Sequence, residues 1–217
     1  MKGLGGKIPN AGTSEKPLEL FVSNAGTAAR FLAAFVCLGH GVYRLSGIPR
    51  MHERPQASLF QALRELGYRV ESENGNDKLP VKIWGAGPKP GKCKVSIEKS
   101  SQFASALLLS AKQGGWEIEI VGENADESPY VAMTSKLIGA FPKDGEFQIE
   151  PDASSGSYFW GVPGVRVAHW PASGWQIDAE FPKFLPLPSS VSRRTQLGDS
   201  IMTAIVLAPF AGQPMQF

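Results

Sequence analysis

Residues 20–30 read Leu-Phe-Val-Ser-Asn-Ala-Gly-Thr-Ala-Ala-Arg, and this stretch decides how the fold begins. The apolar run at its start predicts a strand, and the apolar-periodic run over residues 28–38 predicts a helix. Between the two, we expect Asn24 and Thr27 to cap the helix and Gly26 to let the backbone approach a ligand closely. A strand that leads into such a helix N-terminus is a candidate site for phosphate or carboxylate, and an ordinary strand-to-helix turn is the alternative.

The same alternation of strands and helices recurs along the chain. Strands are expected near residues 20–22, 42–46, 68–72, 81–84, 94–97, 116–121, 147–150 and 165–168, and helices near residues 27–38, 56–66, 101–112, 130–141, 175–185 and 200–207. Phe31 and Phe103 hold like places 72 residues apart, and Pro55 and Pro129 hold like places 74 residues apart. Such self-similarity indicates stacked copies of one supersecondary unit.

The fold class that follows is α/β (α+β), built from repeated βαβαββ units. We expect residues 1–150 to form one nearly complete domain, with two full repeat units and a truncated first unit. Residues 151–217 would begin a second domain, because the helix start at Asp152-Ala-Ser-Ser opens a third copy. The Pro- and Ser-rich residues 182–194 predict a linker or an irregular loop.

Composition excludes several classes of protein. The chain has 217 residues, 42% hydrophobic content and a net charge of +2, which indicates a globular protein and gives no sign of a nucleic-acid or membrane partner. Its apolar runs are too short to cross a bilayer, and no signal peptide opens it. Cys37 and Cys93 show no framework spacing, so a reduced, cytoplasmic setting is expected.

Small polar clusters open several of the predicted helices. Besides the first, these are Ser100-Ser101-Gln102, Ser154-Ser155 and Gly198-Asp199. Hydroxyl and amide donors at several helix starts would suit a multiply anionic ligand, and ordinary capping is the alternative for each. Asp199 could instead serve as a general base beside such a ligand.

Two arginines lie in the loop before the second helix, within Pro49-Arg-Met-His-Glu-Arg-Pro. Arg54 directly precedes Pro55, so its backbone is expected to be extended rather than helical. A guanidinium there could bind a carboxylate or phosphate, or could simply be solvated. The three histidines lack metal spacing, and no Gly-rich nucleotide loop occurs, so we expect neither a zinc-binding helix nor a site for ATP or a dinucleotide.

Taken in order, six segments resemble the enolpyruvyl transferase superfamily, and within it the 5-enolpyruvylshikimate-3-phosphate synthase family. They are Asn24-Ala-Gly-Thr-Ala, Pro49-Arg-Met-His-Glu-Arg-Pro, Ser100-Ser-Gln-Phe, Ser128-Pro-Tyr, Asp152-Ala-Ser-Ser-Gly-Ser-Tyr-Phe and Asp199-Ser-Ile-Met-Thr. The resemblance implies two domains, each of three βαβαββ units. It also implies transfer of the enolpyruvyl group of phosphoenolpyruvate to the 5-hydroxyl of shikimate 3-phosphate, in the shikimate pathway of aromatic amino-acid biosynthesis.

The resemblance also assigns roles to individual residues. Shikimate 3-phosphate would be held by Ser100, Ser101 and Gln102, with Tyr130 against its ring. Phosphoenolpyruvate would be contacted by Gly26 and Arg54, in the segment that includes Asn24 and Thr27. Asp199 would be the base toward the 5-hydroxyl, and no cofactor would be needed.

The sister family, which acts on UDP-N-acetylglucosamine, is an alternative, but its catalytic cysteine has no counterpart at residues 49–51. Phe31 and Glu127 stand where the family has a proline and a serine, so the response to glyphosate stays open. The resemblance places further lysines and arginines outside residues 1–217. The chain is therefore expected to be partial, active with a complementing chain, or else a non-catalytic anion-binding fragment or pseudoenzyme.

Overall fold

The computed structural model describes residue 8 and residues 11–122, 128–142 and 146–217. The chain divides into two compact units, Met1–Asp126 and Glu127–Phe217. The division falls before helix α5 (Pro129–Ala140), whereas the predicted domain boundary lies after it, at residue 150. Glu127 lies outside the described residues.

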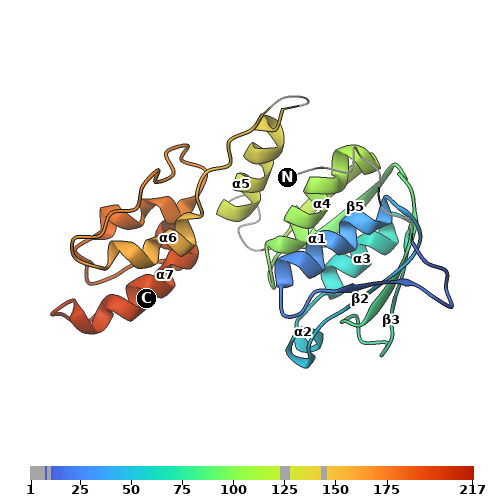
Figure 1. The fold of residues 1–217 in the computed structure, drawn as a ribbon, viewed down its shortest axis with the longest axis horizontal. Coiled ribbons are helices and arrows are strands. Elements are labelled where there is room, and N and C mark those ends of the chain that lie inside the picture. Colours follow the sequence, from blue (N-terminus) through green and yellow to red (C-terminus); the bar gives the residue numbers. More distant parts are fainter. Residues whose placement is uncertain (1–7, 9–10, 123–127, 143–145) are drawn as a thin grey trace. The chain divides into compact units, whose positions relative to one another are not determined.

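The first unit contains the two sheets and the helices that connect their strands (Figure 1). Its strands are β1 (Leu18–Phe21), β2 (His40–Ser46), β3 (Arg69–Ser72), β4 (Val81–Ala86), β5 (Gly91–Ser96) and β6 (Trp116–Val121), and its helices are α1 (Gly26–Cys37), α2 (Pro49–Glu53), α3 (Ala57–Glu65) and α4 (Gln102–Gly114). These positions confirm the predicted alternation of strands and helices over the first 121 residues, apart from α2, which was not expected.

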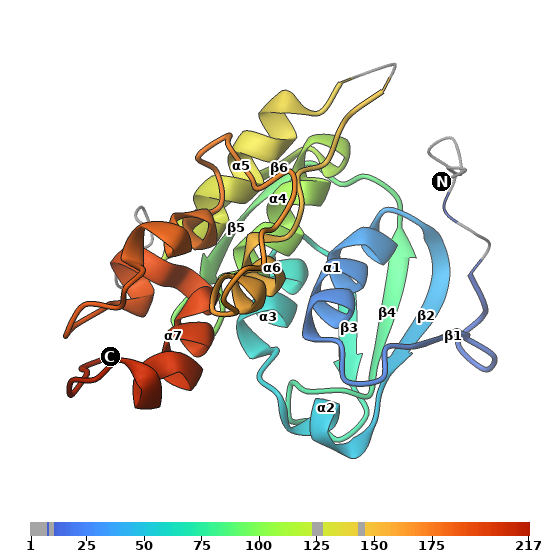
Figure 2. The same cartoon turned by 60° about the vertical axis from the view of Figure 1, so that its left-hand side comes forward.

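The first sheet has the strand order β1-β2-β4-β3. Strands β1 and β2 are parallel and are connected by α1, whereas β4 runs antiparallel to both β2 and β3. Helix α1 covers one face of this sheet (Figure 2), and Leu45, Val81 and Ile83 are completely buried in the core. Because alternate side chains of a strand face opposite ways, this single apolar layer fixes the register of the sheet.

The second sheet repeats the parallel half of the first. Strands β5 and β6 are parallel, and α4 connects them as α1 connects β1 and β2. Helices α1 and α4 pack against each other, so the starts of the two equivalent helices belong to one packed layer (Figure 1). The structure therefore confirms the repeat that Phe31 and Phe103 predict, since both phenylalanines lie in these helices.

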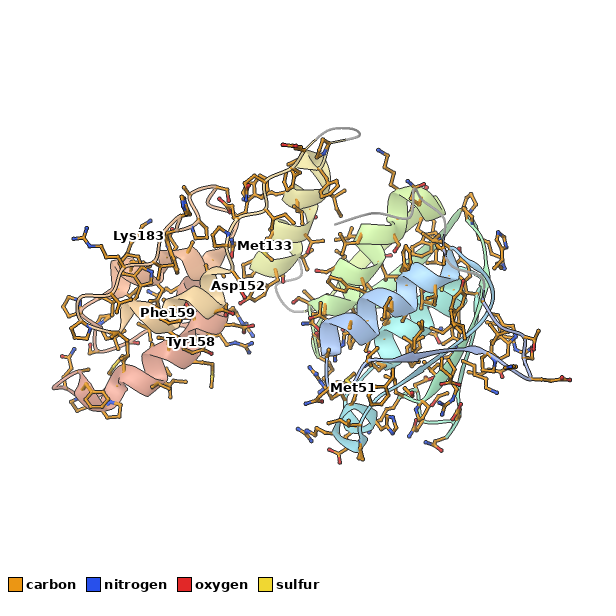
Figure 3. All side chains as sticks on the ribbon, viewed as in Figure 1. Met51, Met133, Asp152, Tyr158, Phe159 and Lys183 are labelled. Carbon is orange, nitrogen blue, oxygen red and sulfur yellow. The ribbon has the colours of Figure 1, made fainter. Side chains whose placement is uncertain are left out.

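The second unit is formed by short helices. They are α5 (Pro129–Ala140), α6 (Ala153–Trp160), η2 (Ile177–Phe184), η3 (Arg193–Leu197), η4 (Gly198–Ser200), α7 (Ile201–Leu207) and η5 (Ala208–Phe210). Asp152, labelled in Figure 3, lies at the start of α6. It caps this helix as predicted, because its carboxylate accepts hydrogen bonds from Ser155 N at 3.2 Å and Ser155 Oγ at 2.6 Å. Apolar side chains of η2, η3 and α7 form the core of this unit, with Phe181 and Leu197 completely buried.

Two predicted strands are wrong, since residues 147–150 and 165–168 pair with no described strand. Near the first, Glu150 is tied to a loop instead, because its carboxylate accepts hydrogen bonds from Ala172 N, Ser173 N and Ser173 Oγ. The helix expected at residues 175–185 is present as the 3₁₀ helix η2, which contains Pro182 and so cannot keep an unbroken α-helical ladder. No helix among the described residues is long and apolar enough to cross a membrane.

Candidate active site

Gly26 and Arg54 meet at the start of α1. A Cβ at Gly26 would lie only 2.6 Å from both terminal nitrogens of the Arg54 guanidinium, so this close approach requires a glycine. Arg54 Nη1 donates a hydrogen bond to the Asn24 carbonyl oxygen at 3.1 Å, which holds the guanidinium across the strand-to-helix turn. The structure thus brings together three residues that the sequence had singled out, Asn24, Gly26 and Arg54.

The backbone of Arg54 has the conformation that its position before Pro55 predicts. Its φ of −71° and ψ of 141° are extended, and it ends the short helix α2. The extended backbone carries the side chain away from α2 and back toward α1. Arg50, in contrast, is exposed and forms an ion pair with Glu53 at 2.5 Å, outside this cluster.

The expectation that Asn24 and Thr27 cap α1 is wrong. The residue at the cap position is Ala25, and no side chain accepts a hydrogen bond from the first turn. Asn24 contributes its backbone carbonyl to Arg54, and the Thr27 hydroxyl accepts a hydrogen bond from Gln102 Nε2 at 3.0 Å. Because no side chain satisfies the N–H groups of the first turn, this helix start keeps free donors and the positive end of its dipole.

Arg30 connects the three segments of the cluster from within the core. It is 3% exposed, and its Nη1 donates to Gln102 Oε1 at 2.6 Å while its Nη2 donates to the Pro55 carbonyl oxygen at 3.2 Å. Gln102 therefore has both ends of its amide fixed, the oxygen by Arg30 and the nitrogen by Thr27. The Arg30 guanidinium also lies over the Phe103 ring, with 5.1 Å from its Cζ to the ring centroid.

The charges of Arg30 and Arg54 are not balanced locally. Burial lowers the pKa of Arg30 to about 10, and the nearby positive charge of Arg54 lowers it as well. Among residues 11–122, neither guanidinium forms an ion pair with a carboxylate. Two positive charges beside an uncapped helix N-terminus form a region that favours an anion.

The start of α4 adds two hydroxyl groups to this side of the unit. Ser100 Oγ accepts a hydrogen bond from Gln102 N at 3.3 Å. Of the two roles considered for Ser100, anion binding and capping, this bond is the one expected for capping. The Ser101 side chain makes no such bond, although Ser101 stands at the cap position of α4. Ser100 and Ser101 are both half-buried beside the fixed amide of Gln102.

Tyr130 and Asp199, the two predicted site residues of the second unit, also meet. Tyr130 lies in the first turn of α5, and its hydroxyl accepts a hydrogen bond from Asp199 N at 2.7 Å and donates one to Asp178 Oδ2 at 3.2 Å. Burial raises the pKa of Tyr130, and the charges of Asp178 and Asp199 raise it further. The hydroxyl therefore stays protonated and can act as a hydrogen-bond donor throughout the neutral range.

Asp178 organises this second cluster. It is 3% exposed, and its Oδ1 accepts a hydrogen bond from Ser200 N at 2.6 Å. Burial raises the pKa of Asp178, although the bonds from Ser200 and Tyr130 oppose this shift. Gly198 has a φ of 55°, and a Cβ there would lie 2.6 Å from the Tyr130 hydroxyl, so glycine is needed for the backbone to pass.

Asp199 does not cap a helix, which was the ordinary expectation for it. Its half-exposed carboxylate accepts a hydrogen bond from Arg193 Nη2 at 2.6 Å. This bond raises the pKa of Arg193 and leaves the Asp199 carboxylate accessible at the surface of the unit. A general base needs such access, because its oxygen must come within hydrogen-bond distance of the proton that it removes.

Sequence reasoning missed three residues of these clusters, namely Arg30, Asp178 and Arg193. Arg30 had a detectable signal, because a charged residue among Ala28–Leu38 follows Gly26 at a spacing of one helical turn. Asp178 and Arg193 had none, since each is brought to Asp199 or Tyr130 only by the irregular packing of η2 and η3. The described residues contain no group of His, Cys, Asp or Glu side chains that could hold a metal ion.

The two sheets and their connecting helices define the class of protein. The structure has the mixed α/β fold of the enolpyruvyl transferases. It is similar to the solved structure of EPSP synthase from Acinetobacter baumannii, with a TM-score of 0.50, 18% sequence identity, and coverage of 67% of this chain and 36% of that one.

The particular family follows from the sequence itself. The family model for EPSP synthase (3-phosphoshikimate 1-carboxyvinyltransferase) matches residues 5–143, so the chain belongs to the EPSP synthase family. It is 40% identical over 186 residues to the 3-phosphoshikimate 1-carboxyvinyltransferase of Vibrio atlanticus, an alignment that covers 76% of this chain and 42% of the relative. It is 37% identical over 204 residues to the enzyme of the same name from Trichormus variabilis, with 82% of this chain and 46% of the relative covered. The chain thus spans less than half the length of these relatives.

Proposed function

We propose that this chain provides part of an enzyme that transfers the enolpyruvyl group of phosphoenolpyruvate to the 5-hydroxyl of shikimate 3-phosphate. The observation that carries the proposal is the pair of arginines, Arg30 and Arg54, which have no carboxylate partner among the described residues and lie beside the uncapped start of α1. Both proposed substrates carry phosphate and carboxylate groups. Such anions supply the negative charge that this cluster lacks.

In the first unit, Arg54 and the N–H groups at Gly26 and Thr27 would bind phosphoenolpyruvate. Arg54 uses only Nη1 for its hydrogen bond to Asn24, so the other side of its planar guanidinium can make a two-point contact with a phosphate or carboxylate. Ser100, Ser101 and Gln102 would bind shikimate 3-phosphate. The fixed Gln102 amide supports this role, because a donor that is already oriented loses little entropy when a ligand binds.

In the second unit, Asp199 would remove the proton of the 5-hydroxyl. The substrate oxygen then forms a bond to C2 of phosphoenolpyruvate while C3 gains a proton, which gives a tetrahedral intermediate. The C2–O bond to phosphate then breaks as C3 loses a proton, so that phosphate leaves and the C2=C3 double bond of the enolpyruvyl group is restored. Tyr130 would lie against the ring of shikimate 3-phosphate, and its hydroxyl fixes the Asp199 backbone. No step in this sequence calls for oxidation or reduction.

The proposal is tested by complementation of cells that lack the pathway enzyme. The chain is expressed alone and fused to the flanking segments of the Vibrio atlanticus relative, and phosphate release from the two substrates is measured on the purified fusion protein. We expect the fusion to restore growth, with the activity lowered about 100- to 1,000-fold by either Arg54→Gln or Asp199→Asn. Arg50→Gln is the matched control for Arg54, because Arg50 lies outside the cluster, and it should leave the rate unchanged.

Two results would decide against this function. A folded fusion protein that releases no phosphate would exclude catalysis by this chain. If calorimetry then shows binding of shikimate 3-phosphate without turnover, the chain is an anion-binding module. Equal activity of the Arg54→Gln and Arg50→Gln variants would contradict the assignment of Arg54.

A further inference from the structure

Among the described residues, the second repeat has no counterpart of the strand hairpin that closes the first. After α3, residues 69–86 form β3, β4 and the turn between them, and β4 then pairs with β2. After α5, only residues 141–152 separate that helix from α6, and this segment is shorter than the hairpin. Strand β6, which corresponds to β2, therefore has no β4 of its own.

The hydrogen-bond pattern shows which groups of β6 are left open. Gly91 N donates to the Gly115 carbonyl oxygen and Ile97 N donates to the Val121 carbonyl oxygen. In a parallel ladder, alternate residues point toward the neighbouring strand. The odd-numbered residues of β6 therefore face β5, and the N–H and C=O groups of Trp116, Ile118 and Ile120 point away from it. No strand in the described part of the chain pairs with this outer edge.

The two edges of this sheet differ in whether side chains bind their outward-pointing N–H groups. The outer edge of β5 is covered by α3, because Lys94 N donates to Glu65 Oε2 at 2.9 Å and Ser96 N donates to Ser58 Oγ at 2.9 Å. Protecting exposed edges in this way is how natural sheets avoid unwanted pairing. The β6 edge has no corresponding hydrogen bonds from described side chains.

Packing behind β6 is also incomplete. Tyr43 and Leu45, which occupy the corresponding places on β2, are 1% and 0% exposed. Ile118 and Ile120 are only half-buried, although Cys93 and Val95 opposite them on β5 are buried. An added strand with apolar residues on the α4 side would cover the two isoleucines as β4 covers β2.

The charges on the other face indicate what kind of strand fits. Glu117 and Glu119 lie there and form ion pairs with Lys92 and Lys94 of β5. A second copy of β6 would place glutamates opposite glutamates in an antiparallel pair, which is unfavourable. Residues 146–150 of this chain, Glu-Phe-Gln-Ile-Glu, would also bring acidic side chains. A strand with Lys or Arg at alternate positions is complementary.

We propose that the outer edge of β6, residues 116–121, binds an extended segment of a different polypeptide. The segment would run antiparallel to β6, with alternating apolar and basic residues, and would complete the sheet of the second repeat. Main-chain hydrogen bonds to Trp116, Ile118 and Ile120 would provide the binding energy, and the contacts with Glu117 and Glu119 would provide the specificity. This inference does not depend on the proposed catalytic function.

The test uses the full chain and two synthetic peptides, Lys-Val-Lys-Ile-Lys-Val and Glu-Val-Glu-Ile-Glu-Val. Amide hydrogen exchange is followed by NMR at each residue of β6. We expect the basic peptide at saturation to slow exchange at Trp116, Ile118 and Ile120 about tenfold, with little change at Glu117 and Glu119, whose N–H groups already bond to β5. The acidic peptide should have no effect.

The double variant Glu117→Lys, Glu119→Lys should reverse this preference, so that the acidic peptide protects the edge and the basic one does not. Glu71→Lys on the edge strand β3 is the matched control, since Glu71 is also an exposed, ion-paired glutamate, and it should leave the preference unchanged. If the double variant does not fold, the difference in protection between the basic and the acidic peptide on the unaltered chain still tests the proposal.

Three results would overturn the proposal. Equal protection by both peptides would show that Glu117 and Glu119 do not select a basic strand. Protection of Trp116, Ile118 and Ile120 in the free chain at every protein concentration would show that this chain covers its own edge. Protection that increases with protein concentration would show that a second copy binds there.

Discussion

The candidate residues of the two units differ in how their charges are balanced. In the first unit, Arg30 and Arg54 lie near each other, no carboxylate in the part of the unit that the structure describes pairs with them, and Arg30 is almost fully buried. In the second, Asp199 is already paired with Arg193, and Asp178 is held by Tyr130 and Ser200. The first cluster therefore needs an external anion to complete it, whereas the second is complete by itself and exposes a single accessible carboxylate.

The largest expected effect tests how far Arg30 holds the first cluster together. Arg30→Met would leave Gln102 Oε1 and the Pro55 carbonyl without their charged donor. We expect the free energy of unfolding of the first unit to fall by about 3 kcal/mol, since hydrogen bonds to charged groups contribute about 1.5–3 kcal/mol each and some desolvation cost is recovered. Urea unfolding, with hydrogen exchange of α1 and α4 read by mass spectrometry, measures the change.

Arg50→Met is the control for this substitution. Arg50 is a 70% exposed partner in an ion pair, and we expect its loss to change stability by less than about 0.5 kcal/mol. If the two substitutions lowered the free energy of unfolding equally, the hydrogen bonds of Arg30 would not stabilise the first cluster.

The second prediction applies the same reasoning to the buried carboxylate of the other unit. Asp178→Ala would leave Ser200 N and the Tyr130 hydroxyl without their acceptor, at a cost of about 2 kcal/mol in stability. Asp178→Asn keeps an acceptor for Ser200 and removes a buried charge, so it should cost less than about 1 kcal/mol. Thermal unfolding followed by tryptophan fluorescence distinguishes the two, and an alanine variant as stable as the asparagine variant would contradict the role of Asp178.

Local periodicity predicted most of the first unit because the strands and helices there bury one clear face each. The extended backbone of Arg54 follows from a short-range rule that needs no tertiary contact, because the residue before a proline avoids the helical conformation. The strand expected at residues 147–150 failed for a non-local reason. Alternation of apolar residues makes a strand only when the segment pairs with another strand, and residues 147–150 pair with none among the described residues.

The candidate site was predictable only residue by residue. The sequence singled out Gly26, Arg54, Gln102, Tyr130 and Asp199, but no pattern in it shows that Gly26 touches Arg54 or that Arg30 links Gln102 to Pro55. These contacts join residues 25–72 positions apart. The packing of α1 on α4 creates the contact of Arg30 with Gln102, and the return of the chain after α2 brings Arg54 and Pro55 to α1. The roles of these residues in substrate binding and catalysis stay predictions.

The third prediction separates the geometry of the first cluster from its stability. Gly26→Ala would place a methyl group 2.6 Å from the Arg54 guanidinium, which is the mobile end of a long side chain and can move. We therefore expect the free energy of unfolding to change by less than about 1 kcal/mol, while Arg54 moves away from Asn24 and calorimetry shows weaker binding of phosphoenolpyruvate.

Gly139→Ala in α5 is the matched control, because nothing lies within 4 Å of a Cβ at that helical position. It should stabilise its helix by about 0.5–1 kcal/mol and leave binding unchanged. If Gly26→Ala bound phosphoenolpyruvate as the unaltered chain does, the contact of Gly26 with Arg54 would have no role in anion binding.

The smallest expected effect is a pH dependence that belongs to the second cluster. Burial raises the pKa of Asp178 above its ordinary value of 3.8, so the folded protein takes up a proton at this site before the unfolded chain does. As the pH falls from neutral through the raised pKa toward 3.8, this group therefore adds to the free energy of unfolding.

Asp178→Asn cannot take up that proton, so the stability of the unaltered chain relative to this variant should increase as the pH falls. Tyr130→Phe removes a hydrogen bond that lowers the pKa of Asp178, and the increase should then begin at a higher pH. Urea unfolding at a series of pH values measures both differences, and a relative stability that stays constant or decreases toward acid pH would show that Asp178 is not held as a buried, destabilised charge.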